Sequence, residues 1–291
     1  MYYLNANAET NPKHPDYEIY RSRRAKEILD APDSIIIVPE IFASVFSRFK
    51  KAQLCVWWLS VDNYLPYDVA NCANRVDFDD RRIVHLAQSE YATQFLRRRG
   101  ARTIIALTDY IHESLRTPAA SKERKDIILY NPAKGIEFTR QLIEAFPTKT
   151  FVPLKGLNKA SLRDLFQTAK LYIDFGHHPG KDRMPREAAA LGCCILTSLS
   201  GAAGNSIDTP IGRAYKFEIS ASSVEPIGKM FDDIFANYKT RIHDFARIRD
   251  VIANQEAEFR IEAQVFGLHM AHRLGCPFSV QENSDPQALA V

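Results

Sequence analysis

The segment from residue 171 to residue 197, LYIDFGHHPGKDRMPREAAALGCCILT, carries the clearest structural signal in the sequence. It starts and ends with short apolar runs, Leu171–Phe175 and Cys194–Thr197, which are typical of buried strands in a parallel sheet. Between them, Pro185–Leu191 has helical composition, with a proline suited to the first turn. A strand, a helix and a second strand in this order predict a parallel unit of an α/β sheet.

The alternation of strands and helices extends outward from this segment in both directions. Before it, the sequence predicts a strand, a helix, a strand and a helix at residues 126–130, 136–146, 150–153 and 161–169, with Ser161 as the last N-cap. After it, the chain is expected to be mostly helical from Ser222 to about Leu274, and then polar and frayed.

A second series of strands and helices fills the first part of the chain. Apolar runs predict strands at residues 34–39, 53–60, 83–87 and 103–107, with helices at 17–29, 41–51 and 89–98. The polar segment 117–125 contains Pro118 and is the expected linker. We therefore predict an α/β fold of two Rossmann-like, doubly wound domains, residues 1–117 and 118–275, followed by a flexible tail, residues 276–291.

The composition is that of an ordinary globular protein, 46% hydrophobic and 25% charged over 291 residues. No nucleic-acid partner is expected, because the net charge is only +3 and the arginine clusters at 21–24 and 97–99 fall on predicted helices. Five cysteines without CxxC spacing indicate neither a disulfide framework nor a zinc site. No long apolar segment or signal peptide is evident, so we expect a cytoplasmic protein, with peripheral contact at the inner face of the membrane left open.

Three loops of the second half follow strands, where open α/β sheets bind ligands. They are residues 131–135, 176–187 and 198–205, and all three suit an anion such as a nucleotide diphosphate. The residues expected to contact this donor are Asn131, Lys134, Gly135, Lys181, Arg183, Glu187, Gly201, Ala202 and Gly204.

The side chains of these loops suggest separate roles. Lys134 would stand at a helix N-terminus after the tight turn at Gly135, while Lys181 and Arg183 could neutralise a diphosphate. Glu187 could accept hydrogen bonds from a ribose diol. Structural alternatives stay open: Lys134 also suits a solvated loop, and a glutamate in the first turn of a helix complements its dipole.

No metal site is expected from the sequence. His177 and His178 show no carboxylate–histidine metal spacing and are interpreted as surface residues. Asp79 and Asp80 precede Arg81-Arg82, and this stretch is typical of a charged surface rather than a metal-binding carboxylate pair.

The Lys134-Gly135 turn and the stretch PREAAALGCCILTS, residues 185–198, resemble the donor-binding domain of GT-B-fold glycosyltransferases. The similarity is closest to the large retaining group with a paired-glutamate motif, and it extends over about residues 35–217. It implies two domains facing across a cleft, with Glu187 as the glutamate that binds the donor ribose. The first glutamate of the pair would fall at Pro179, so its contact with the transferred sugar is missing or moved.

The resemblance also implies how catalysis would be divided. A retaining GT-B enzyme can use the departing diphosphate to deprotonate the acceptor, and Lys134, Lys181 and Arg183 would then stabilise the leaving group. An inverting enzyme needs a base across the cleft, and Asp62, just after the strand at residues 53–60, is the candidate. The alternative for Asp62 is an Asx turn that ends this strand.

The expected function is the transfer of a sugar from a nucleotide diphosphate sugar, which is a substrate rather than a cofactor, to a glycan or lipid-linked acceptor. The resemblance implies cell-surface polysaccharide synthesis as the setting. Two alternatives remain: a non-catalytic GT-B-like binding or partner subunit, and a sugar-nucleotide epimerase of related fold. The sugar, the base, the acceptor, the stereochemistry and the oligomeric state are left open.

Overall fold

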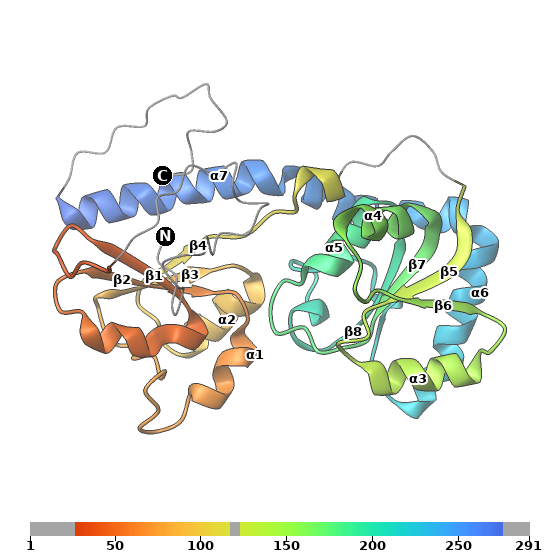
Figure 1. Cartoon of the computed structure of the whole chain (residues 1–291), viewed down its shortest axis with the longest axis horizontal. Coiled ribbons are helices and arrows are strands. Elements are labelled where there is room, and N and C mark those ends of the chain that lie inside the picture. Colours follow the sequence, from red (N-terminus) through yellow and green to blue (C-terminus); the bar gives the residue numbers. More distant parts are fainter. Residues whose placement is uncertain (1–26, 117–122, 276–291) are drawn as a thin grey trace.

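The computed structural model describes residues 27–116 and 123–275, which form two lobes (Figure 1). Each lobe is built on its own parallel sheet, and one long helix, α7 (Ala246–Leu274), runs along both lobes. Most of the expected helix at 17–29, most of the expected linker at 117–125 and the whole tail at 276–291 lie outside the described residues.

The N-terminal lobe contains four parallel strands in the order β1-β2-β3-β4. The strands are β1 (Ile35–Pro39), β2 (Gln53–Trp58), β3 (Ile83–Ala87) and β4 (Ile104–Ala106). The helical segments are η2 (Glu40–Arg48), α1 (Val61–Tyr64), η3 (Leu65–Tyr67), α2 (Glu90–Arg98) and η4 (Glu113–Leu115). As predicted, Ser89 caps α2: its hydroxyl accepts a hydrogen bond from the Ala92 N–H at 3.1 Å.

Opposite faces of this sheet are covered in different ways. On one face, the fully buried Trp58 ring packs in a cluster with Tyr64, Phe78 and Phe95. On the other, α7 covers strands β2 to β4 with side chains spaced at three to four residues, namely Phe259, Ala263, Phe266 and Met270. The helical C-terminus therefore packs back onto the N-terminal lobe.

Strand β1 departs from the expectation of a strand buried on both faces. Ile35 and Ile37 are 39% and 45% exposed. Because β1 lies at the edge of the sheet, beyond the strands that pack with α7, one of its faces has no helix over it among the described residues.

The C-terminal lobe contains five parallel strands in the order β6-β5-β7-β8-β9. The strands are β5 (Lys125–Tyr130), β6 (Thr150–Pro153), β7 (Ala169–Asp174), β8 (Cys194–Ser198) and β9 (Lys216–Phe217). The helices are α3 (Ile136–Ala145), α4 (Lys159–Thr168), α5 (Arg183–Ala190) and α6 (Val224–Arg241), with short turns η5 (Gly201–Gly204), η6 (Arg213–Tyr215), η7 (Ala221–Ser223) and η8 (Ile242–Phe245). The chain moves outward in opposite directions from β5 to β6 and to β7, so the crevice between β5 and β7 is a topological switch point, where such sheets bind ligands.

Two local predictions are wrong. The N-cap of α4 is Asn158, whose side-chain oxygen accepts a hydrogen bond from the Ser161 N–H at 2.9 Å; Ser161 itself lies inside the helix. Residues 61–64 form a short helix and not an Asx turn, so Asp62 is helical. No helix in the described residues is both long enough and apolar enough to cross a bilayer.

Candidate functional site

The loops that follow β5 and β7 touch at the switch point through two glycines. Gly135 has a left-handed backbone, with φ of 59°, and a Cβ added to it would lie 2.6 Å from the Gly176 nitrogen. A Cβ on Gly176 would in turn lie 2.5 Å from Lys134 Cβ. Side chains at either position would force the loops apart, so the glycines bring Lys134 against the loop after β7.

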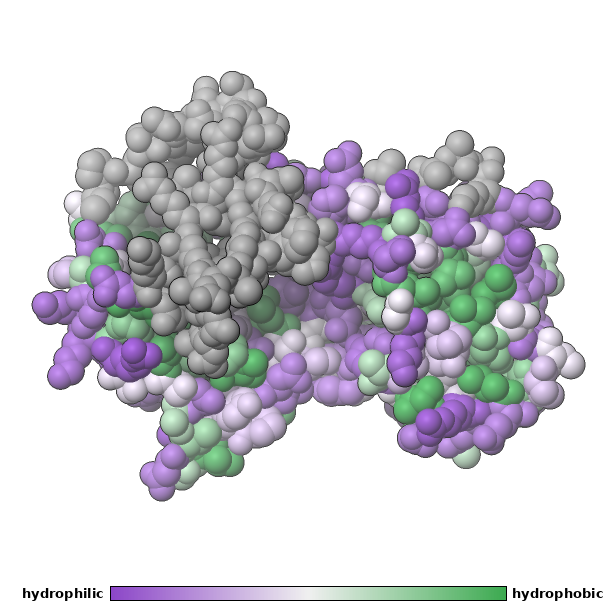
Figure 2. Space-filling model, in the orientation of Figure 1, coloured by the Kyte–Doolittle hydropathy of each residue, from purple (hydrophilic) through white to green (hydrophobic). Residues whose placement is uncertain are grey.

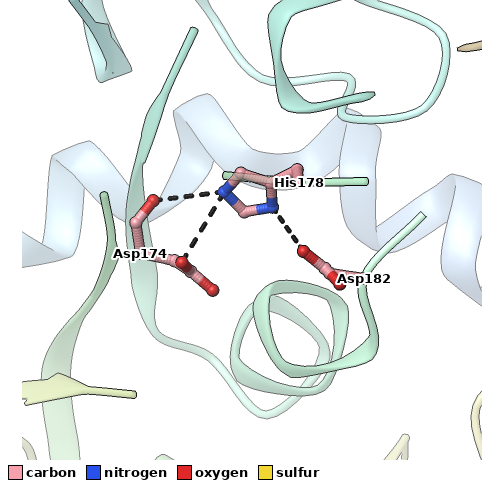
Figure 3. A group of neighbouring side chains, drawn as sticks. All are labelled: Asp174, His178 and Asp182. Atoms are coloured by element: carbon pink, nitrogen blue, oxygen red, sulfur yellow. Dashed lines mark hydrogen bonds and ion pairs between the residues drawn. The ribbon is translucent and has the colours of Figure 1, made fainter. Parts of the chain in front are cut away.

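A compact charged cluster lies at the end of β7 (Figure 3). The imidazole of His178 sits between two carboxylates: its Nδ1 is 2.7 Å from Asp182 Oδ2, and its Nε2 is 3.6 Å from Asp174 Oδ1. The His178 side chain is 3% exposed, so the prediction of a surface histidine is wrong at this position. That prediction is confirmed for His177, whose side chain is 52% exposed.

Lys134 completes the cluster and supplies its positive charge. Its Nζ lies 2.5 Å from Asp182 Oδ2 and 3.7 Å from Asp174 Oδ2. Burial acts to raise the pKa of Asp182, but the hydrogen bond from His178 and the charge of Lys134 outweigh it and hold this pKa below its usual value. The prediction of a solvated loop lysine is therefore wrong, because Lys134 is held by two carboxylates.

Asp174, His178 and Asp182 are also the residues that could hold a metal ion, since each offers a ligand atom within 4.8 Å of the others. The prediction that His178 has no carboxylate–histidine spacing is therefore wrong, because Asp174 and Asp182 lie four residues before and after it in the sequence. The ammonium of Lys134 already occupies a cation's place beside both carboxylates. The arrangement fits a lysine held by acidic groups better than a metal centre.

Helix α5 presents the two residues expected to contact the donor's diphosphate and ribose. It begins at Arg183, two residues earlier than predicted, so Glu187 lies beyond the first turn, which contains no acidic residue. Complementing the helix dipole therefore does not account for Glu187. Glu187 is 4% exposed, and burial raises the pKa of its carboxyl although Arg183 Nη2 lies 3.3 Å from its Oε1.

The third predicted donor loop, residues 198–205, packs against the second, residues 176–187. Gly201 has φ of 64°, and a Cβ there would lie 2.0 Å from the His178 carbonyl oxygen. The same oxygen accepts a hydrogen bond from the Ala202 N–H at 2.8 Å, so this amide is engaged within the protein. Gly204 ends the same short turn. Asn131 forms an Asx turn, in which its Oδ1 accepts a hydrogen bond from the Ala133 N–H at 3.0 Å.

Asp62, in α1 shortly after β2, contacts the C-terminal lobe. Its carboxylate accepts a hydrogen bond from the Tyr91 hydroxyl at 2.9 Å, and its Oδ2 lies 2.6 Å from His177 Nε2. The other ring nitrogen of His177 contacts the hydroxyl of Ser200. Sequence reasoning found Asp62 but missed His177, Tyr91 and Ser200, since no pattern links residues so distant in the chain.

Backbone atoms of the two lobes lie in close contact. A Cβ on Gly180 would lie 1.9 Å from the Leu59 carbonyl oxygen, so only glycine allows this approach. Asp208 of the C-terminal lobe accepts hydrogen bonds from the backbone N–H groups of Glu90 and Tyr91 at 2.8 and 2.9 Å. Two buried or half-buried contacts add to these, Arg186 with Asp109 at 2.9 Å and Lys181 N–H with Gln88 Oε1 at 3.2 Å.

Comparison with known proteins bears on this two-lobe arrangement. No protein-family model matches the sequence, and no curated protein matches it. In structure, the chain is similar to a mutant of TarM from S. aureus in complex with fondaparinux, alpha-GlcNAc-glycerol and UDP, with a TM-score of 0.60 and 12% identity over 84% of this chain and 56% of that one. It is also similar to sucrose-phosphate synthase from Thermosynechococcus elongatus (TM-score 0.62, 14% identity, 82% and 74% covered) and to HepE from Anabaena in complex with UDP (TM-score 0.58, 9% identity, 80% and 78% covered).

These solved structures are GT-B glycosyltransferases, and the chain shares their fold. The predicted pair of Rossmann-like lobes is thereby confirmed. At 9–14% identity the similarity establishes the fold alone. The chain spans 56% of the length of the TarM chain.

Proposed function

We propose that this chain is a glycosyltransferase that moves a sugar from a nucleotide diphosphate sugar to a glycan or lipid-linked acceptor. The observation that carries the proposal is the meeting of three groups around the crevice between the lobes. Lys134 lies at the switch point, Arg183 and Glu187 lie on α5, and Asp62 and His177 lie opposite each other across the lobes. The solved GT-B structures that contain UDP add support.

The donor nucleotide would bind at the C-terminal lobe. Glu187 is a buried carboxylate whose ion-pair partner among the described residues is the exposed Arg183, so it is suited to accept hydrogen bonds from a ribose diol. Arg183 is the first residue of α5, where the backbone N–H groups and the helix dipole favour an anion. A diphosphate would therefore lie between the start of α5 and Lys134.

Catalysis would rest on charge stabilisation and on positioning. Lys134 and Arg183 would neutralise the departing diphosphate, which is the group on which negative charge develops. Lys134 would exchange part of its contact with Asp182 for the phosphate. For an inverting reaction the acceptor hydroxyl needs a base, and the pair formed by Asp62 and His177 is the candidate, because His177 is exposed and oriented by a carboxylate.

The setting of the reaction is part of the same proposal. Cell-surface polysaccharide synthesis in the cytoplasm, at or near the inner face of a membrane, would supply acceptors of the proposed kind. Oligosaccharide and lipid-linked acceptors offered with each nucleotide sugar in a product assay would test this step separately from donor binding.

The first experiment is a screen of donor binding by thermal shift and calorimetry with UDP, GDP, ADP, CMP, dTDP and their sugar conjugates. Selective stabilisation by one diphosphate supports the donor site and identifies its base, because a ligand that prefers the folded state raises the melting temperature. Glu137→Ala, in the first turn of α3, serves as a control. Nucleotide binding that is lost in Glu187→Ala and retained in Glu137→Ala would support a donor site at α5.

A non-catalytic GT-B-like subunit is the second candidate. Two observations favour it: Pro179 stands where the resemblance expects a glutamate, and Lys134 is already paired with two carboxylates. The absence of stabilisation by every nucleotide in a well-folded sample would make this candidate the better one.

A further inference from the structure

A buried carboxylate lies at the end of β1 in the N-terminal lobe. It belongs to Glu40, which directly follows this strand and is only 3% exposed. Burial raises the pKa of Glu40, because water no longer solvates the charge. Burying a carboxylate costs free energy unless hydrogen bonds compensate it, so the groups that bond to Glu40 indicate why it is there.

Both oxygens of Glu40 are used by the backbone of the loop that follows β2. Its Oε2 accepts a hydrogen bond from the Leu59 N–H at 2.9 Å, and its Oε1 accepts one from the Ser60 N–H at 3.0 Å. The parallel pairing of the two strands, with Pro39 beside Trp57, brings Glu40 to these groups. A carboxylate suits this pair of N–H groups, because it has two acceptor oxygens and no donor.

The loop that Glu40 holds leads directly to Asp62. Ser60 is the N-cap of α1, and Asp62 lies in the first turn of that helix, two residues after Ser60. The carboxylate of Asp62 reaches His177 Nε2 at 2.6 Å. Because so short a stretch of chain separates Ser60 from Asp62, the position of Asp62 depends on where Glu40 holds the Ser60 N–H.

The same loop also contacts the segment that contains His177. The Leu59 carbonyl oxygen faces Gly180, where an added Cβ would lie 1.9 Å from it, and Gly180 is three residues after His177. Leu59 therefore has its N–H bonded to Glu40 and its carbonyl group against the other lobe. A shift of this residue would change both the loop that leads to Asp62 and the contact with the loop of His177.

We propose that Glu40 is a positioning residue for the pair formed by Asp62 and His177. By accepting hydrogen bonds from Leu59 and Ser60, Glu40 fixes the loop at the place where Asp62 meets His177 across the lobes. Because Glu40 is buried, it acts through these residues and not on a substrate. The catalytic part of this inference rests on the proposed glycosyl transfer, whereas the contact of Asp62 with His177 can be measured without any substrate.

The test follows the ring nitrogens of His177 by NMR on the isotope-labelled full chain. The His177→Gln spectrum assigns the signals, and Asp62→Asn shows where they lie when the carboxylate is removed. In Glu40→Gln an amide NH₂ replaces one acceptor oxygen, so one of the two backbone N–H groups loses its bond. The ring signals of His177 are expected to move in Glu40→Gln from their wild-type positions toward those of Asp62→Asn.

Asp30→Asn is the matched control in the same lobe. The Asp30 carboxylate also accepts hydrogen bonds from backbone N–H groups, those of Lys50, Lys51 and Ala52 at 3.0, 2.8 and 2.9 Å. These residues precede β2, whereas the residues held by Glu40 follow it. Asp30→Asn should therefore leave the ring signals of His177 unchanged, whatever its effect on the melting temperature.

A shorter acid provides a second variant in case Glu40→Gln does not fold. Glu40→Asp keeps the charge, but its carboxylate is one methylene closer to the backbone and cannot reach both N–H groups in the same geometry. The ring signals of His177 are expected to move in this variant as well.

Turnover provides the catalytic measurement. In an enzyme that transfers sugar, Glu40→Gln should lower kcat by about 10- to 100-fold and leave the Kd of the donor unchanged, because the misplaced pair serves the acceptor. Combined with His177→Gln, it should lose little more than His177→Gln alone, since both substitutions act on the same pair. An unchanged kcat, or a fully additive loss, would overturn the positioning role.

The ring signals separate this inference from the proposed function. Signals of His177 that stay at their wild-type positions in the Glu40 variants, or that move equally in Asp30→Asn, overturn the positioning role even if the enzyme transfers sugar. Signals that move in the Glu40 variants alone, in a chain that glycosylates no acceptor, support the positioning of Asp62 and His177 and count against the proposed function.

Discussion

His177 Nε2 lies 2.6 Å from Asp62 Oδ2, so a histidine of the C-terminal lobe is oriented by a carboxylate of the N-terminal lobe. The two residues lie 115 positions apart in the chain, Asp62 in α1 and His177 in the loop after β7. Tyr91 holds the same carboxylate at 2.9 Å, and Ser200 contacts the other nitrogen of the ring. With 52% of its side chain exposed, His177 is open to an acceptor.

Replacing His177 by glutamine should lower the turnover of sugar transfer by about 10- to 100-fold, because the candidate base is lost. Donor affinity measured by calorimetry should stay unchanged, since the substitution leaves Lys134, Arg183 and Glu187 in place. His243→Gln, an exposed histidine of η8, is the matched control. Unchanged turnover in His177→Gln would mean that the contact of His177 with Asp62 is purely structural.

Glu187→Ala should weaken the binding of the nucleotide diphosphate by roughly tenfold, because a carboxylate that accepts hydrogen bonds from the ribose is removed. The melting temperature without ligand should change little or even rise, since burial disfavours the charge of this side chain. Calorimetric titration of both proteins is the measurement. Equal affinity in the two would remove Glu187 from the donor site.

Arg183→Ala should reduce turnover more than it reduces stability. The side chain is 49% exposed and makes one ion pair, so its loss should cost less than about 1 kcal/mol of unfolding free energy. Its charge at the start of α5 is expected to matter most as the diphosphate departs. A large drop in melting temperature, with activity per folded molecule intact, would instead make Arg183 structural.

Asp208→Ala should destabilise the folded chain by about 1–2 kcal/mol, because two N–H groups at the start of α2 lose their acceptor. Urea unfolding of the variant and of wild type measures the difference. Asp79→Ala, at a side chain 87% exposed, should be neutral. If both variants unfold at the same urea concentration, Asp208 does not fasten the lobes.

Stability at acid pH should depend on Asp182. Its folded-state pKa is held below the unfolded value of 3.8, so the ionised carboxyl stabilises the chain above about pH 4. This contribution is lost as the pH falls through the lowered folded-state pKa. The free energy of unfolding, measured across this range, should fall more steeply with acidification in wild type than in Asp182→Asn. Asp250→Asn, at an exposed position of α7, should follow the wild-type curve.

Much of the fold could be predicted because its signals are local. The runs at residues 53–58 and 194–198 are apolar enough to predict strands from composition alone. Ser89, directly before an amphipathic helix, predicts the N-cap of that helix. The positions that were predicted wrongly depend on contacts with residues far away in the chain. Ile35 and Ile37 have the same composition as buried strand residues, and only the place of β1 at the sheet edge leaves them exposed.

The candidate site likewise has features that the sequence predicts and features that depend on the tertiary structure. The sequence by itself determined which loops follow strands, and so it pointed to Lys134, Arg183, Glu187 and Asp62, because strand ends and residue chemistry are readable along the chain. Only the tertiary structure decided that Lys134 is held by Asp182, that the Lys181 N–H contacts Gln88 of the other lobe, and that His177 meets Asp62. These contacts depend on how closely the two lobes approach, as at Gly180 and Leu59, and no local sequence pattern specifies the distance between the lobes.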